Sequence, residues 1–239
     1  MQPSLLKHLK IAALSVALPL AGMSSAHGSI SLNFVLPDNT SSEQILNYYN
    51  GGADQNGAIG PNYGITFGPD SLALVNNSQN PPNSNVGNEP GGGNSAVFLS
   101  GPGDVMNVAG GFTTGFSFYQ ASAFPGSVTV YSGPNDTGTV LASLSWAATG
   151  LNGSEPYYGI WASEGVSFAG TAESVDFSGT ADYIAFTDVT IGSANPGNGN
   201  GHSNGVPDHT GLGIYVLAAL GLAGAAKASR RQAVATVRF

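Results

Sequence analysis

The sequence has 239 residues, with six Lys and Arg, fourteen Asp and Glu, four His and no Cys. All basic residues lie near the two ends, whereas residues 27–208 hold all fourteen acidic residues and no Lys or Arg, a formal charge of −14. A segment without Lys or Arg cannot neutralise phosphates, which excludes nucleic-acid binding and a P-loop. The absence of Cys excludes disulfides, zinc–thiolate sites and Cys nucleophiles.

Residues 1–26 have the three parts of a secretory signal peptide. Lys7 and Lys10 precede the apolar residues 11–22, and the small residues that follow favour cleavage between Ala26 and His27. The apolar stretch is shorter than the roughly 20 residues that a membrane-spanning helix needs. We therefore predict that the chain is exported and that the mature protein begins at His27.

Residues 27–192 are predicted to form one all-β domain. Apolar and polar residues alternate over short runs that Gly, Pro, Asn and Asp interrupt, which is typical of half-buried strands. This pattern favours a two-sheet β-sandwich of jelly-roll type. Residues 76–95 are predicted to be a long loop and residues 193–205 a flexible Gly/Asn-rich linker. The expected strands lie within 29–36, 63–67, 72–75, 96–99, 105–108, 112–118, 128–130, 140–146, 166–168, 175–177 and 184–191.

Residues 206–239 combine a short motif, an apolar stretch and a basic cluster. The apolar residues 211–226 are at the short limit for crossing a bilayer, and basic residues that follow such a helix stay in the cytoplasm. The sequence therefore predicts a single transmembrane helix that leaves the domain outside the cell. The motif residues are Val206, Pro207 and Asp208, and the basic residues that stop transfer are Lys227, Arg230 and Arg231.

This tail resembles the sorting signal of the PEP-CTERM class of bacterial surface proteins, which exosortases process. The usual motif of that class is VPEP, and Val206-Pro207-Asp208 is similar to its VPD-type variants. The resemblance implies transient anchoring in the membrane, cleavage by an exosortase-type protease, and a final location on the cell surface or in the extracellular matrix. A plain membrane anchor is the alternative for the same residues.

The domain also resembles one that is frequent among PEP-CTERM proteins. The similarity spans residues 48–195 and rests on segments 49–52, 63–67, 106–118 and 128–133. The last strand departs from the usual pattern, since Thr187 stands where the first of two Asp is expected. The resemblance implies a lectin-like β-sandwich without established catalytic residues.

Most catalytic mechanisms are excluded, because residues 28–201 contain no His, Cys, Lys or Arg. Serine triads need His and Schiff-base chemistry needs Lys. An amino-terminal His27 resembles that of copper-dependent polysaccharide monooxygenases, but the domain lacks the second His that copper requires. Carboxylates remain, so a secreted glycoside hydrolase is the alternative function, with its pair drawn from Glu43, Glu89, Glu155, Glu164 and Glu173.

Calcium is the cofactor that suits this composition, because it binds oxygen ligands and needs no nitrogen or sulfur. An ion in such a sandwich would connect the first and last strands. We predict that Asp188 binds it together with Asp38, Asn39 or Asp70.

Four aromatic residues lie close together in the sequence, around the Gly/Pro-rich residues 150–159. Trp146 ends an alternating strand and is predicted to lie in the core. Exposed aromatic side chains stack on sugar rings, so Tyr157, Tyr158 and Trp161 are candidate glycan-binding residues, unless they cover a sheet edge. The sequence thus predicts a non-catalytic surface or matrix protein that associates with extracellular polysaccharide.

Overall fold

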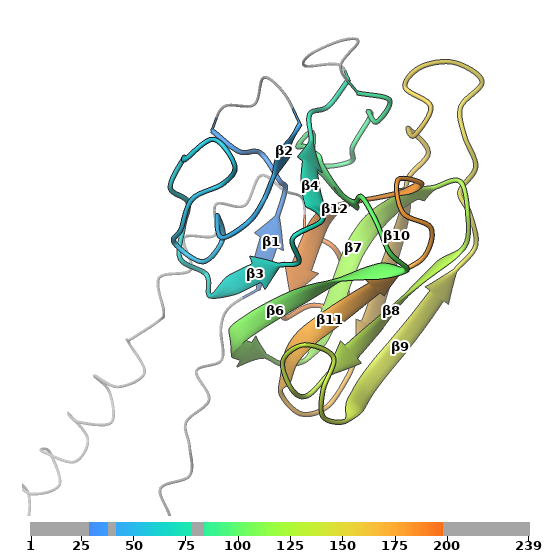
Figure 1. Cartoon of the computed structure of the whole chain (residues 1–239). Helices are drawn as coiled ribbons and strands as arrows, with labels where there is room; N and C mark the ends of the chain where they lie inside the picture. The colour runs from blue at the N-terminus through green and yellow to red at the C-terminus, as the bar shows by residue number, and fades with distance from the viewer. Residues whose placement is uncertain (1–28, 38–41, 78–83, 198–239) are drawn as a thin grey trace, which may run out of the picture.

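The computed structural model describes residues 29–37, 42–77 and 84–197, which form two packed β-sheets (Figure 1). None of these residues belongs to a helix long and apolar enough to cross a membrane. The predicted signal peptide, Asp38, most of the linker and the tail 206–239 lie outside the described residues.

The larger sheet has seven strands, all paired antiparallel. Its order is β10-β7-β12-β5-β4-β2, and β1 also pairs with β12, with Ile30 opposite Ile191. Its strands are β1 (Ile30–Leu32), β2 (Glu43–Gln44), β4 (Ser71–Leu74), β5 (Ser95–Phe98), β7 (Gly115–Ser122), β10 (Ala162–Ser167) and β12 (Ile184–Ile191).

The second sheet has five antiparallel strands in the order β3-β6-β11-β8-β9. Together the two sheets confirm the predicted all-β sandwich. The strands of this sheet are β3 (Ile65–Phe67), β6 (Gly103–Phe112), β8 (Gly126–Tyr131), β9 (Val140–Trp146) and β11 (Ala172–Ser178).

The core between the sheets is rich in aromatic side chains. The ring centroids of Phe177 and Phe186 lie 4.7 Å apart, and Phe118 lies 5.9 Å from Phe177. Trp146 is buried against Phe118 at 5.4 Å, which confirms that it is a core residue. Aromatic pairs at these distances add to the stability that burial alone provides.

A second apolar cluster lies on the other face of the seven-stranded sheet. There Val97, Ala121 and Ala185 are buried beneath Val86 and Tyr158. Backbone hydrogen bonds hold these covering segments together, since Tyr158 N donates to Asn85 O at 2.9 Å and Gly87 N donates to Tyr158 O at 3.1 Å. Residues 85–87, in the second half of the predicted long loop, are therefore hydrogen-bonded to the segment at Tyr158 and cover the outer face of the sheet.

Candidate functional site

A cleft of ≈ 310 Å³ opens beside this second cluster, on the outer face of the seven-stranded sheet. Clefts of about this size and larger are where proteins bind small ligands. The strands β4, β5 and β12 contribute apolar residues to it, and loops contribute its polar groups. The lining residues are Leu72, Leu74, Asn85, Val86, Val97, Leu99, Tyr158, Asp182, Ile184 and Ala185.

The apolar floor arises from the register of β4 and β5. Leu72 of β4 pairs with Val97 of β5, and both contact the outer cluster, whereas the next pair, Ala73 and Ala96, belongs to the core between the sheets. Leu72 and Leu74 of β4 and Val97 of β5 therefore face outward, whereas Phe98 of β5 faces the core between the sheets. Leu99, just beyond β5, remains 39% exposed, so the outer apolar surface is only partly covered.

Tyr158 is the one residue of the cleft lining that has a hydroxyl group. Burial raises the pKa of its phenol, and the neighbouring Tyr183 and Asp182 raise it further. The phenol is therefore neutral at physiological pH and able to donate a hydrogen bond. Asn85 adds an exposed amide, and Asp182 is the single charged residue of the lining.

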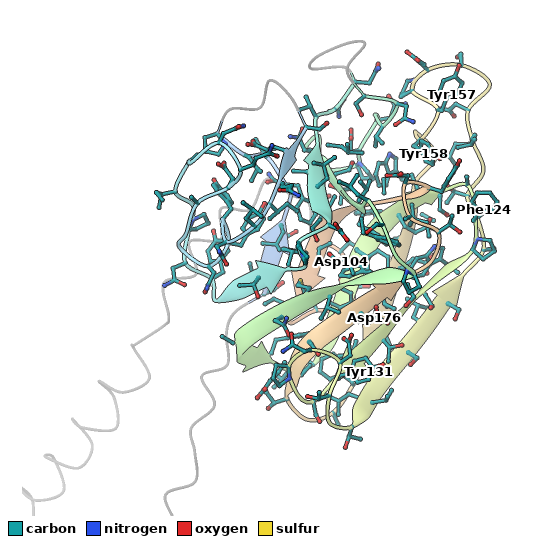
Figure 2. All side chains as sticks on the ribbon, in the orientation of Figure 1. Asp104, Phe124, Tyr131, Tyr157, Tyr158 and Asp176 are labelled. Carbon is teal, nitrogen blue, oxygen red and sulfur yellow. The ribbon has the colours of Figure 1, made fainter. Side chains whose placement is uncertain are left out.

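An exposed aromatic pair lies next to the cleft residues in sequence. Tyr183, between Asp182 and Ile184, meets Phe124 edge to face with ring centroids 5.1 Å apart, and both rings are nearly half exposed. Figure 2 shows Phe124 at the edge of the sandwich. The sequence analysis missed this pair, although each residue adjoins a turn and could have been flagged as an exposed aromatic.

The three aromatic residues predicted to bind glycan do not share one exposed surface. Tyr157 is 42% exposed on the projecting loop, whereas Tyr158, nearer the strands, is 6% exposed (Figure 2). Trp161 is partly buried, and its Nε1 donates to Gly87 O at 2.9 Å. Tyr158 and Trp161 therefore follow the alternative that they cover the sheet, because they pack against the loop that contains Gly87, and glycan binding by the three residues stays a prediction.

The residues predicted to bind calcium are also separated. Asp188 is fully buried in β12, beside Asn94 at one end of β5, where Thr187 Oγ1 donates to Asn94 O. Asp70 lies at the other end, where its carbonyl accepts from Leu99 N, about 16 Å away along the strand at ~3.3 Å per residue. Asp70 and Asp188 therefore cannot share an ion, and calcium binding by Asp188 stays a prediction.

The carboxylate of Glu89 interacts electrostatically with that of Asp188. Burial raises the pKa of Glu89, hydrogen bonds from Ser95 and Asn76 oppose the shift, and the charge of Asp188 adds to it. Gly91 also lies against this region, since a Cβ there would be 2.5 Å from Asp188 Oδ2. Among the described residues no group of three or more His, Cys, Asp or Glu is placed to hold a metal ion.

The glutamates considered for glycoside hydrolysis are dispersed. Glu43 and Glu89 are buried, Glu155 is exposed in a loop, and Glu164 and Glu173 lie on β10 and β11 in different sheets. Three clefts contain one carboxylate each, namely Asp104, Asp182 and Glu173. A glycosidase needs two carboxyl groups about 5–9.5 Å apart at one site, which none of these clefts provides.

The chain matches no protein-family model and no curated protein. Among solved structures it is similar to a family 6 carbohydrate-binding module, with 17% identity over 53% of this chain and 86% of that one and a TM-score of 0.36. A CBM6 from Clostridium stercorarium in complex with cellobiose gives 18% identity, coverage of 53% and 84%, and a TM-score of 0.35. A β-1,3-glucan binding CBM6 from Bacillus halodurans gives 18%, coverage of 55% and 87%, and 0.34. These TM-scores are too low to establish a common origin or a shared ligand.

Proposed function

We propose that this chain is a non-catalytic surface or matrix protein that binds neutral polysaccharide in the cleft over β4, β5 and β12. The observation that carries the proposal is the combination of an apolar floor with the Tyr158 hydroxyl, the Asn85 amide and the Asp182 carboxylate around it. A sugar ring has an apolar C–H face and an edge of hydroxyl groups, so it needs both kinds of surface. Few, well-placed polar groups in an apolar cleft are typical of ligand sites.

The charge of the domain favours a neutral ligand. Residues 27–208 carry fourteen acidic side chains and no Lys or Arg, so a uronate or sulfate polymer would be repelled. Asp182 can accept hydrogen bonds from sugar hydroxyls without needing a cationic partner. We therefore expect uncharged glucans or mannans to bind and alginate to fail.

Export and sorting complete the proposal. The signal peptide at 1–26 would direct secretion, and an exosortase-type protease would cleave the tail near Val206-Pro207-Asp208. The jelly-roll winding is supported by the path of the chain, because strands β5 to β8 and β10 to β12 alternate between the two sheets. The linker at 193–205 would separate this sandwich from the membrane before cleavage.

The binding experiment can use the intrinsic fluorescence of the protein, because Trp146 and Trp161 are its two tryptophans. A Trp146→Phe variant leaves Trp161 as the single indole, and Trp161 packs against the cluster that contains Tyr158. Titration with soluble β-glucan, xylan and galactomannan should change its emission, and alginate should not. Absence of binding to every neutral polysaccharide would refute the proposed site.

A matched pair of leucine variants locates the ligand. Leu99→Ser changes a 39% exposed side chain in the cleft lining, and Leu151→Ser changes a comparably exposed leucine outside it. If a sugar covers the exposed part of Leu99, its removal should weaken binding about three- to sevenfold. Leu151→Ser should bind like wild type. Equal affinities for the two variants would place the ligand elsewhere.

A reducing-sugar assay on the same polysaccharides separates binding from hydrolysis. We expect binding without product, because the cleft contains a single carboxylate. Release of reducing ends that disappears in Asp182→Asn would instead show a glycoside hydrolase.

A further inference from the structure

A second pair of buried carboxylates lies at β2, the edge strand of the seven-stranded sheet, and neither residue lines the cleft. Glu43 of β2 is 2% exposed, and Asp54 of the following loop is 3% exposed. The loop is fixed to the strand by two hydrogen bonds: Gln55 N donates to Gln44 O at 3.1 Å, and Gln44 N donates to Gln55 Oε1 at 2.9 Å. The loop that contains Asp54 is therefore fixed to β2, the strand that contains Glu43.

Asn56 connects the two carboxylates. Its backbone N donates to Asp54 Oδ1 at 3.0 Å, and its Nδ2 donates to Glu43 Oε2 at 2.5 Å. Ala58 N also donates to Asp54 Oδ1, at 2.8 Å. Because one asparagine contacts both acids, the two carboxylates lie close together.

The second oxygen of Asp54 differs from the first. Asp54 Oδ2 is buried and has no hydrogen-bond partner among the described residues. An unsatisfied buried carboxylate oxygen is costly unless a cation compensates it. Residues 28–201 contain no Lys, Arg or His, so no side chain of the described domain can supply that positive charge.

The negative charges of Asp54 and Glu43 both act on the phenol of Tyr48. Burial raises the pKa of its phenol most, Asp54 raises it further, and Tyr63 and Glu43 add smaller effects. The negative charges of both carboxylates therefore act on one point beside β2. A bound cation there would lower the pKa of the same phenol.

We propose that Glu43 and Asp54 bind a divalent cation, Ca²⁺ in an extracellular setting, with Asp54 Oδ2 as a direct ligand. The loop offers oxygen ligands alone: two carboxylates, the Asn56 amide and backbone carbonyls. Calcium accepts such a set completed by water, whereas zinc prefers nitrogen and sulfur. With two acidic ligands, we expect an affinity on the order of 10⁻⁴–10⁻³ M.

This site is distinct from the one predicted around Asp188. Glu43 lies on β2, and Asp188 lies on β12, three strand spacings away across β5 and β4. At ~4.8 Å per spacing the two strands are about 14 Å apart. The two sites can therefore be tested separately by substitution.

The test uses Tb³⁺ and Ca²⁺ on protein first treated with EDTA. Excitation of tyrosine should sensitise Tb³⁺ luminescence, because Tyr48 lies beside the site, and Ca²⁺ should displace the signal. Ca²⁺ should also raise the melting temperature of wild type. Asp54→Asn should lose at least tenfold in Ca²⁺ affinity, because the amide keeps an oxygen for the two backbone donors but places NH₂ where Oδ2 lies.

Two further variants make the result decisive. Glu155→Gln alters an exposed acid in a loop and should retain full calcium binding. Glu43→Gln should weaken it like Asp54→Asn, and it replaces that variant as the test if Asp54→Asn does not fold. The proposal would be overturned if Asp54→Asn or Glu43→Gln responded to calcium like wild type. It would also be overturned if Asp188→Asn alone abolished the calcium response.

Discussion

The two tryptophans should contribute very differently to stability. Trp146 is buried between the sheets, with its ring 5.4 Å from Phe118 and 6.1 Å from Phe186. It also fills the space above Gly126, where a Cβ would lie 2.5 Å from Trp146 Cζ2. Trp146→Ala would leave a cavity in this aromatic core, which costs about 3–5 kcal/mol. In a domain of this size that loss lowers the melting temperature by about 6–20 °C.

Trp161→Ala should cost less. The indole is partly buried on the outer face of the sheet, and its one hydrogen bond is the 2.9 Å contact from Nε1 to Gly87 O. Loss of part of a ring's burial and of one neutral hydrogen bond amounts to about 1–2.5 kcal/mol. Trp161→Phe keeps most of the packing and should lose about 1 kcal/mol.

Thermal and urea unfolding followed by far-ultraviolet circular dichroism measures all three variants against wild type. The expected order of stability is wild type, Trp161→Phe, Trp161→Ala and then Trp146→Ala. A melting temperature of Trp161→Ala below that of Trp146→Ala would refute the division of the apolar residues into a main core and a smaller outer cluster.

Acidification from about pH 7 to about pH 4.5 should raise the melting temperature, because burial raises the pKa of three carboxyl groups in the folded state above their ordinary values of about 4. The stability that their protonated forms contribute is lost as pH rises through the raised values, and a fall in stability on acidification over this range would contradict the reasoning. The three groups are Glu89, Asp104 and Asp136. Gly126→Ala should cost about 1–3 kcal/mol through overpacking against Trp146, measured in the same melts, and an unchanged melt would show that the indole has room to move. Mass spectrometry of the secreted protein should find His27 first, and an intact Met1 in that fraction would exclude cleavage. Neutral residues at 227, 230 and 231 should impair processing of the tail, and unchanged surface yield would count against a sorting role.

The sequence was sufficient to predict the sandwich and its core. Alternation predicts β8 and β11 correctly, because Val128, Val130, Val175 and Phe177 all face the core. It is less informative for β12, where all eight residues are buried. This strand lies in the middle of its sheet and is covered on both faces, so a period of two carries no signal there.

The cleft could not be predicted in the same way. Its formation depends on the pairing of Val86 with Tyr158, two residues far apart in the chain, which buries a tyrosine that its neighbours in sequence mark as exposed. The outward orientation of Leu72 and Leu74 depends on the register of β4 against β5. Local composition contains neither piece of information, because both are set by long-range backbone contacts.

The pairing of β1 with β12 determines how the domain would be presented on a surface. Ile30 lies opposite Ile191, so the chain enters and leaves the sandwich at the same end. Asp182 and Ile184, which line the cleft, lie at the other end of β12, about 23 Å away at ~3.3 Å per residue. A domain attached through its C-terminal tail would therefore carry the cleft at the end of the sandwich farthest from the point of attachment.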